Sequence, residues 1–361
     1  MMAKAEPGYA VDPLHPRRAP ELVGHDRPWE SFCASRAGGR IPHAWLLVGP
    51  RGVGKATFAY RAAIEVLAGR SGDRSPAPTE ASDHPVRRRV WAGSHGDLLA
   101  IERHKGASEP RRIPVETVRE LRHFFGLTSA EAGWRVAIVD ALDDLNLHGV
   151  NALLKIVEEP PPRALLFLIA HRVRSVPATI RSRCRWLPFA GLAHDECVQV
   201  LERLLPDQDA AQRSGLAHLA NGAPGLALTF ADAEALTLFG EITALCRTLP
   251  ALDVPAAHAF SDRFARRPGS ERFPTFAAMF KIWVHRAAIR IVAGDESVGD
   301  DIVEDEGEVQ RRYGTAAGLA GVLSLWNDVG QIADAAVHAH LDRKQAVLDV
   351  LFASRRLARG A

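Results

Sequence analysis

Residues 49–55, Gly-Pro-Arg-Gly-Val-Gly-Lys, are the segment whose residue types and spacing most directly indicate chemistry. They fit the pattern G-x-x-x-x-G-K of a phosphate-binding loop, in which glycines let backbone N–H groups turn towards a polyphosphate. The apolar run 45–48 precedes the loop, and a helical pattern begins at Phe58. The motif requires this context, because the helix N-terminus adds partial positive charge to the site. The segment therefore predicts a nucleotide-binding loop rather than a chance glycine-rich turn.

Two groups that phosphoryl transfer needs are missing from this site. The position after Lys55 should carry Ser or Thr, whose hydroxyl ligates Mg²⁺, but it is Ala56. A second apolar run, 136–139, ends in Asp140, and the next position, where a hydrolytic protein would carry a water-activating Glu, is Ala141. We predict a fold that has kept its phosphate cradle and lost its catalytic groups, and binding of ATP or ADP stays open. The residues predicted to bind nucleotide are Gly49, Gly52, Gly54, Lys55, Thr57 and Asp140.

The elements that must position this loop are short apolar runs alternating with helical patterns. This alternation predicts an α/β fold, a parallel sheet with helices on both faces. The expected strands are 45–48, 97–101, 136–139, 165–169 and 185–189, the last at a sheet edge because of its proline. The expected helices are 26–37, 58–64, 114–125, 151–159, 194–204, 212–219, 275–292 and 316–337. The remaining expectations are an extended arm at 1–20, a flexible insertion at 70–84 and an acidic loop at 295–308.

Length and composition limit the class of protein. At 361 residues the chain is long enough for two or three domains, and 47% apolar with 24% charged residues is an ordinary globular balance. A net charge of +2 is too small to attract nucleic acid or a membrane to the protein as a whole. The basic runs 87–89 and 181–185 are interpreted as solvated faces, as most such runs are. The four cysteines form no C-x-x-C pair, so we expect no metal and no structural zinc. Scattered thiols are typical of a reducing compartment, and the N-terminus has no apolar signal core, so we expect a cytoplasmic protein. No run of ~18 apolar residues occurs, so we expect no membrane span.

Several segments together resemble one family. The matching segments are 22–25, 42–45, 151–155, 158–161 and 179–184, the last containing Ser-Arg-Cys at 182–184. In this order they resemble the clamp-loader branch of the AAA+ ATPases. The degenerate catalytic positions are similar to those of the bacterial DNA polymerase III delta-prime subunits, and the phrases at 140–146 and 341–345 resemble alphaproteobacterial members. The resemblance is strong over about residues 22–188, moderate to about 235 and weak beyond.

The resemblance implies three domains and an assembly. They are an AAA+ nucleotide-binding-like domain at 1–190, a small helical lid at 191–238 and an all-helical collar for oligomerisation at 239–361. The implied partners are gamma/tau and delta subunits in a five-subunit ring that opens the sliding clamp and closes it on primed DNA, as a component of the DNA polymerase III holoenzyme. With Ala56 and Ala141 in the nucleotide site, we expect no intrinsic ATPase activity.

The resemblance also implies that Arg183 faces the nucleotide of a neighbouring subunit as an arginine finger. A guanidinium is permanently charged, planar and able to bond two phosphate oxygens at once. Arg181 and Arg185 compete for this role, and the alternative is that Arg183 only pairs with an acidic neighbour. His171 corresponds to the family's phosphate sensor. The lid stretch 222–228 lacks the phosphate-contacting Arg of active members.

Other side chains have simpler explanations. Glu158 and Glu159, about 100° apart on a helix, are interpreted as helix-end and interface contacts rather than an acid/base pair. His43 and His95, which lack partner residues, are interpreted as core or surface histidines. The aromatic residues expected in a helical core are Phe280, Trp283 and Trp326.

Two rival functions remain. One is an ATP-hydrolysing gamma/tau-like AAA+ motor subunit, which Ala56 and Ala141 disfavour. The other is a stand-alone P-loop kinase, which the Ser-Arg-Cys signature and the helical C-terminal third disfavour.

Overall fold

The structure is a computed structural model that describes residues 14–69, 84–102, 115–127, 133–265, 272–294, 300–338 and 342–360. Its internal contacts divide the chain into two compact units. Unit 1 comprises residues 1–200 with 222–225, and unit 2 comprises 201–221 with 226–361. The three-domain division expected from the sequence stays a prediction.

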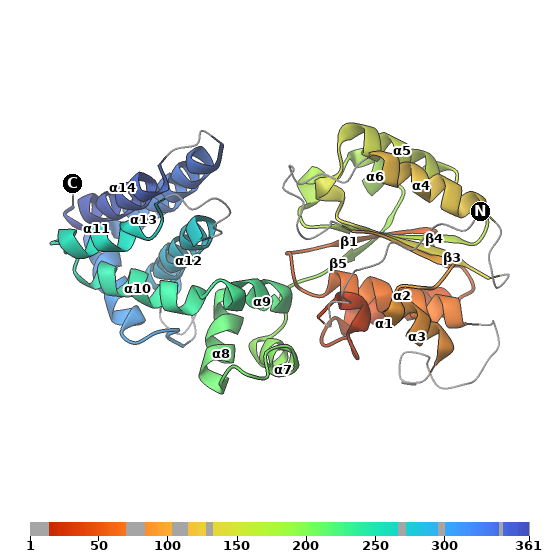
Figure 1. Ribbon diagram of the computed structural model, residues 1–361, viewed down its shortest axis with the longest axis horizontal. Helices are drawn as coiled ribbons and strands as arrows, with labels where there is room; N and C mark the ends of the chain where they lie inside the picture. The colour runs from red at the N-terminus through yellow and green to blue at the C-terminus, as the bar shows by residue number, and fades with distance from the viewer. Residues whose placement is uncertain are drawn as a thin grey trace. The chain divides into compact units, whose positions relative to one another are not determined.

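Unit 1 is built on a five-stranded sheet in the order β2-β3-β4-β1-β5 (Figure 1). The strands are β1 Ala44–Val48, β2 Leu98–Glu102, β3 Arg135–Asp140, β4 Ala164–Ala170 and β5 Arg185–Pro188. All neighbouring strands pair in parallel, so their carboxyl ends share one edge of the sheet. Figure 1 shows α1, α2 and α3 on one face of the sheet and α4, α5 and α6 on the other. The predicted α/β fold, a parallel sheet with helices on both faces, is confirmed.

The central strands are buried along their whole length. Every residue of β1 and β4 is buried, which explains why they appear in the sequence as uninterrupted apolar runs. β5 is an edge strand in which Leu187 alone is buried, and Pro188 ends it where a missing N–H costs least. The predicted edge position of this strand is confirmed.

The helices of unit 1 agree with the sequence in most places. They are α1 Asp26–Ala37, α2 Lys55–Ala68, α3 Pro85–Ala92, α4 Val115–Gly126, α5 Leu147–Glu158 and α6 Ala178–Arg181, with 3-10 turns η1 Pro16–Arg18, η2 Leu142–Asp144 and η3 Val173–Ser175. α3 was not expected, and the solvated-face interpretation is wrong for Arg87, which is buried with its guanidinium 4.3 Å from the Trp91 ring centroid. The extended-arm prediction is wrong at η1, which packs against α2 and α3. The rest of the arm, 1–13, and most of the predicted insertion, 70–83, lie outside the described residues.

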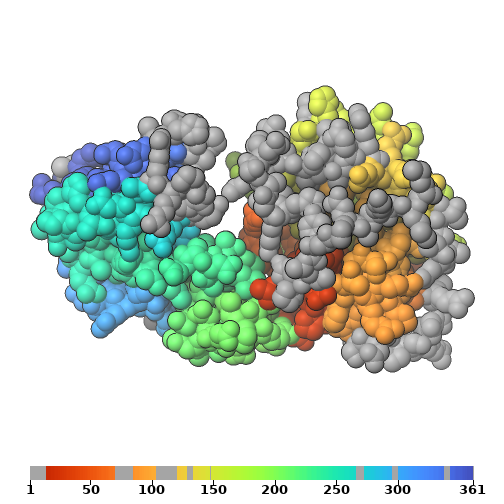
Figure 2. Space-filling model, viewed as in Figure 1, coloured from red at the N-terminus to blue at the C-terminus, as the bar shows by residue number. Residues whose placement is uncertain are grey.

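Unit 2 is helical wherever the structure describes regular elements. α7 His194–Leu204 and α9 Pro224–Asp232 each have residues in both units. The helices that belong to unit 2 alone are α8 Ala210–Leu219, α10 Ala235–Arg247, α11 Val254–Asp262, α12 Arg272–Ala293, α13 Glu306–His338 and α14 Arg343–Ala358. α11 and α14 pack together although they are far apart in sequence, and Figure 2 shows their cyan and blue residues against one another. Gly318, at φ +65°, interrupts α13.

Two expectations for unit 2 need correction. Phe280 and Trp283 are fully buried as expected, but Trp326 is 39% exposed, with Lys281 Nζ 3.8 Å from its ring centroid. The acidic loop is shorter than predicted, because α13 begins at Glu306, whose carboxylate is buried against Arg286. None of the described helices is long and apolar enough to cross a membrane.

Candidate functional site

The candidate phosphate-binding loop, residues 49–55, lies between β1 and α2, and each of its predicted glycines has a physical reason. Gly52 and Gly54 adopt φ +81° and +105°, a region that residues with a Cβ rarely enter. Gly49 packs so closely that an added Cβ would lie 2.1 Å from the carbonyl oxygen of Phe189. The loop conformation therefore depends on glycine at all three positions.

Lys55 is the first residue of α2 and is 3% exposed. Its Nζ donates hydrogen bonds to the carbonyl oxygens of Gly49, at 2.7 Å, and Pro50. Burial lowers the pKa of Lys55 to about 8, although the charge of Asp140 opposes this shift. The lysine therefore bonds to its own loop, and contact with a phosphate would require it to leave these carbonyls.

Asp140 lies at the carboxyl end of β3, in register with Glu102 of β2. Burial raises the pKa of Asp140 to about 6, and the charge of Glu102 adds to this effect while that of Lys55 reduces it. Glu102 in turn pairs with His15 Nε2 at 2.9 Å and accepts a hydrogen bond from the Tyr60 hydroxyl. The structure thus brings Lys55 and Asp140 together at one edge of the sheet, as the sequence predicts.

A pair of residues beside this edge extends the site. The backbone N–H of His171, just after β4, donates to Asp143 Oδ2 at 2.6 Å, and the Ser175 hydroxyl donates to Asp143 Oδ1 at 2.5 Å. Although burial acts to raise it, the pKa of Asp143 is held below its usual value by these hydrogen bonds. Burial, with the charge of Lys55, lowers the pKa of His171 to about 4, so this ring is neutral at pH 7. Asp143 was not predicted to be a site residue. Its position three residues after Asp140 could have indicated it.

Two residues from outside the loop hold the loop's carbonyl groups. His25 Nε2 lies 2.7 Å from the carbonyl oxygen of Val53, and burial lowers the pKa of this histidine. The backbone N–H of Gly225, in the first turn of α9, donates to the carbonyl oxygen of Gly52 at 2.9 Å. Neither contact was predicted, since both join segments that are distant in sequence.

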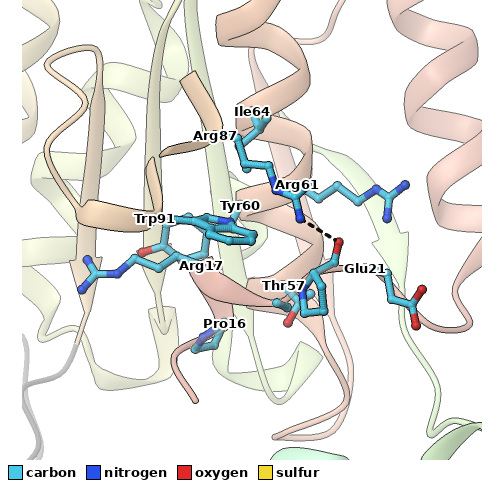
Figure 3. A pocket seen from close by; sticks show the side chains of 11 residues that line it. Pro16, Arg17, Glu21, Thr57, Tyr60, Arg61, Ile64, Arg87 and Trp91 are labelled. Atoms are coloured by element: carbon cyan, nitrogen blue, oxygen red, sulfur yellow. Dashed lines mark hydrogen bonds between the residues drawn. The ribbon is translucent and has the colours of Figure 1, made fainter. Parts of the chain in front are cut away.

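Thr57, also predicted to bind nucleotide, lines a small pocket between η1, α2 and α3 (Figure 3). Its neighbours there include Tyr60, Trp91 and Pro16, and Arg87 closes one side by donating to the carbonyl oxygen of Pro20 at 3.3 Å. The predicted role of Thr57 stays a prediction.

Arg183 lies away from this group, between α6 and β5. Its Nη1 donates to the carbonyl oxygen of Thr179 at 3.1 Å and to the Ser182 hydroxyl at 3.4 Å, and its Nη2 lies 3.2 Å from Glu158 Oε1. An acidic partner for Arg183 therefore exists within the chain. Glu158 contacts Arg183 rather than Glu159, in line with its interpretation as a helix-end contact.

The remaining candidates are structural. His43 Nε2 lies 2.9 Å from the carbonyl oxygen of Val157, and buried His95 accepts the backbone N–H of Asp97 at 3.2 Å. Within the ranges that the structure covers, no cluster of three or more His, Cys, Asp or Glu side chains could hold a metal ion.

Comparison with known proteins shows what residues in the N-terminal half are similar to. A family model described as "DNA polymerase III, delta subunit" matches residues 24–193. The DNA polymerase III subunit delta' of Pseudomonas aeruginosa is 33% identical over 201 residues, 55% of this chain and 58% of that protein. The subunit tau of Escherichia coli is 30% identical over 223 residues, 62% of this chain and 33% of that protein. The chain thus spans about half or less of these relatives.

Solved structures add only a distant likeness. A DNA polymerase III gamma subunit-related protein of Thermotoga maritima matches with a TM-score of 0.40 and 16% identity, over 91% of this chain and 99% of that one. The sequence matches are the informative ones, and they confirm the resemblance to the clamp-loader family.

Proposed function

We propose that this chain, which over residues 24–193 is a delta-prime-like relative of the gamma and tau subunits of DNA polymerase III, is a clamp-loader subunit that does not hydrolyse ATP. It would support ATP-dependent loading of the sliding clamp onto primed DNA. The observation that carries the proposal is a complete phosphate cradle in which Ala56 and Ala141 replace two groups of the hydrolytic machinery.

The second candidate is a gamma/tau-like motor, since relatives of both kinds match the chain. Hydrolysis needs a bound Mg²⁺ and a positioned water, and Ala56 offers no oxygen to the metal. Ala141 is buried and carries no proton acceptor beside Asp140. These two residues favour the non-hydrolysing role.

The residues present fit a nucleoside di- or triphosphate. The bound nucleotide would place its negatively charged phosphates in the loop and would not be hydrolysed there. Gly49, Gly52 and Gly54 shape the loop, and an added Cβ at Gly49 would collide with Phe189. Lys55 would exchange its loop carbonyls for a phosphate oxygen, with Thr57 and Asp140 as the remaining candidate contacts. Binding of ATP or ADP is therefore part of the proposal, and no zinc is included.

Arg183 gives this chain a role in a neighbour's reaction. An arginine supplied across an interface stabilises charge on the transferring phosphoryl group, an effect of ~10³–10⁵ in rate in well-studied GTPases. This chain lacks catalytic groups of its own, but its exposed Arg183 guanidinium would contact the phosphates bound by an adjoining gamma/tau subunit. The proposal places the chain beside gamma/tau and delta in a five-subunit cytoplasmic ring, with clamp and DNA reached through the complex and no membrane partner.

Steady-state ATP turnover tests the proposal. The purified chain should show negligible turnover, and Lys55→Ala should leave the rate of the reconstituted loader nearly intact. Arg183→Ala should slow clamp- and DNA-stimulated turnover while the ring still assembles, and Arg183→Lys should not restore it fully, because an ammonium lacks the bidentate fork. Robust turnover by the purified chain that Lys55→Ala abolishes would establish the motor function instead.

A further inference from the structure

Glu158 and Arg183 form an ion pair between the end of α5 and the segment that follows α6. Glu158 is the last residue of α5, and Arg183 follows α6 by two positions. Their side chains approach to 3.2 Å and are 43% and 42% exposed, respectively. An exposed pair of this kind contributes little to folding stability. The place of this pair, at the candidate finger, indicates a role other than folding stability.

The contacts of Arg183 lie mainly at one nitrogen of its guanidinium. Nη1 donates to the Thr179 carbonyl and the Ser182 hydroxyl, and Nη2 lies 3.2 Å from Glu158 Oε1 in an ion pair. A guanidinium has five N–H donors in a rigid fork, so donors on Nε and Nη2 remain for oxygens of an incoming group. An arginine side chain held in this way loses less conformational entropy when it binds a phosphate.

The same contacts distinguish Arg183 from its two competitors. In the region from α5 to β5, neither the Arg181 nor the Arg185 side chain has an ion pair. The contact found at Arg181 is at its backbone carbonyl, which accepts the Trp186 indole N–H at 2.8 Å. Of the three arginines, Arg183 is the one whose guanidinium makes both hydrogen bonds and an ion pair with described residues.

We propose that Glu158 is a positioning residue for Arg183. The inference rests on the proposed function, in which Arg183 contacts the neighbour's phosphates. Glu158 anchors Nη2 on the α5 side, so the guanidinium occupies one orientation while its remaining donors stay available. Preorganisation of a transition-state contact raises kcat and leaves ground-state ATP binding by the neighbour nearly unchanged.

Glu158→Gln in the reconstituted loader tests the inference, with Glu159→Gln as the matched control. Gln keeps the size of the side chain and removes its charge. Glu159 is the adjacent exposed residue, at the C-cap of α5, where its backbone N–H bonds to the Lys155 carbonyl. Glu158→Gln should lower kcat by roughly three- to tenfold with KM for ATP within about twofold of wild type. Glu159→Gln should change neither. Equal kcat for the Glu158→Gln and wild-type loaders overturns the inference.

A double-mutant cycle shows whether Glu158 acts through Arg183. The double variant Glu158→Gln/Arg183→Ala should turn over at the rate of Arg183→Ala alone. Additive losses would show that Glu158 acts by another route and overturn the inference. If Arg183→Ala slows the loader and Glu158→Gln does not, the inference fails while the proposed function stands. If Arg183→Ala has no effect, the finger role itself fails and the inference falls with it.

Discussion

The backbone N–H of Gly225 donates to the carbonyl oxygen of Gly52 at 2.9 Å, which ties the first turn of α9 directly to the phosphate-binding loop. An added Cβ at Gly225 would lie 3.0 Å from the Gly52 Cα and 3.3 Å from its carbonyl oxygen. Both atoms belong to backbone, which cannot rotate away as a side chain would. Glycine at this position therefore permits the approach of the two segments.

Gly225→Ala should lower the free energy of unfolding by about 1 kcal/mol, since the loss of this contact outweighs the usual gain from replacing a helical glycine. The measurement is urea unfolding followed by circular dichroism. Gly240→Ala in α10 is the control, because an added Cβ there meets its nearest atom at 3.7 Å. That variant should gain about 0.5–1 kcal/mol. Equal effects of the two substitutions would contradict the role given to the Gly225 contact.

Asp140 should make stability depend on pH in the acid range. Its pKa is raised to about 6 by burial and by Glu102, above the ordinary value of 3.8. The folded state therefore binds the proton more tightly than the unfolded chain does. The resulting stabilisation is fully present below pH ~3.8 and is lost as pH rises through ~6.

Asp140→Asn tests this dependence. At pH 7 the variant should be more stable than wild type by up to about 3 kcal/mol, from 1.36 kcal/mol per pKa unit, and the difference should shrink between pH 6 and 4. The measurement is urea unfolding of both proteins across that range. A difference that does not change with pH would show that Asp140 does not titrate as described.

Glu306 should be essential for the stability of unit 2. It is fully buried and accepts a hydrogen bond from Arg286 Nε at 2.5 Å and another from Gln310 Nε2 at 2.9 Å. Glu306→Ala should cost about 3–5 kcal/mol, because it leaves the Arg286 charge buried without its main partner. Glu241→Ala, at the exposed pair with Arg263, should cost less than about 1 kcal/mol. Comparable losses in chemical denaturation would refute the distinction.

The exposed apolar face of α13 should contribute to assembly. Leu319, Leu323 and Trp326 are 37%, 50% and 39% exposed and follow helical spacing. Leu323→Glu should reduce incorporation into the loader in size-exclusion chromatography while the free energy of unfolding stays within about 0.5 kcal/mol of wild type. Ser324→Glu, at the next exposed position, is the control. Full incorporation of Leu323→Glu would exclude this face from the interface.

Much of the fold and part of the site could be predicted from local sequence. The runs that became β1, β3 and β4 are apolar without interruption because both faces of a parallel sheet are covered, so each could be recognised by itself. The loop glycines and Lys55 could be named because a phosphate cradle needs them at fixed spacing. The position of Pro188 at an edge followed from its missing N–H.

Other features depended on contacts between distant segments. Trp326 has the same helical spacing as core residues, and only the packing of α12 and α13 leaves it exposed. Arg87 belongs to a basic run, yet it is buried because its guanidinium stacks on Trp91. Spacing records which residues can share a face, but the burial of that face depends on what packs against it.

The sequence by itself determined the strands, the glycines and lysine of the candidate phosphate-binding loop, and the side chains at Ala56 and Ala141 that carry no oxygen, because each depends on residue types at short, fixed separations. Only the tertiary structure decided that β4 lies between β1 and β3, that Glu158 lies within ion-pair distance of Arg183 and that Gly225 contacts Gly52. The physical reason is that strand order and hydrogen bonds between distant segments are set by which surfaces pack together. Strand order and these contacts depend on several segments together, so the periodicity of any one segment does not indicate them.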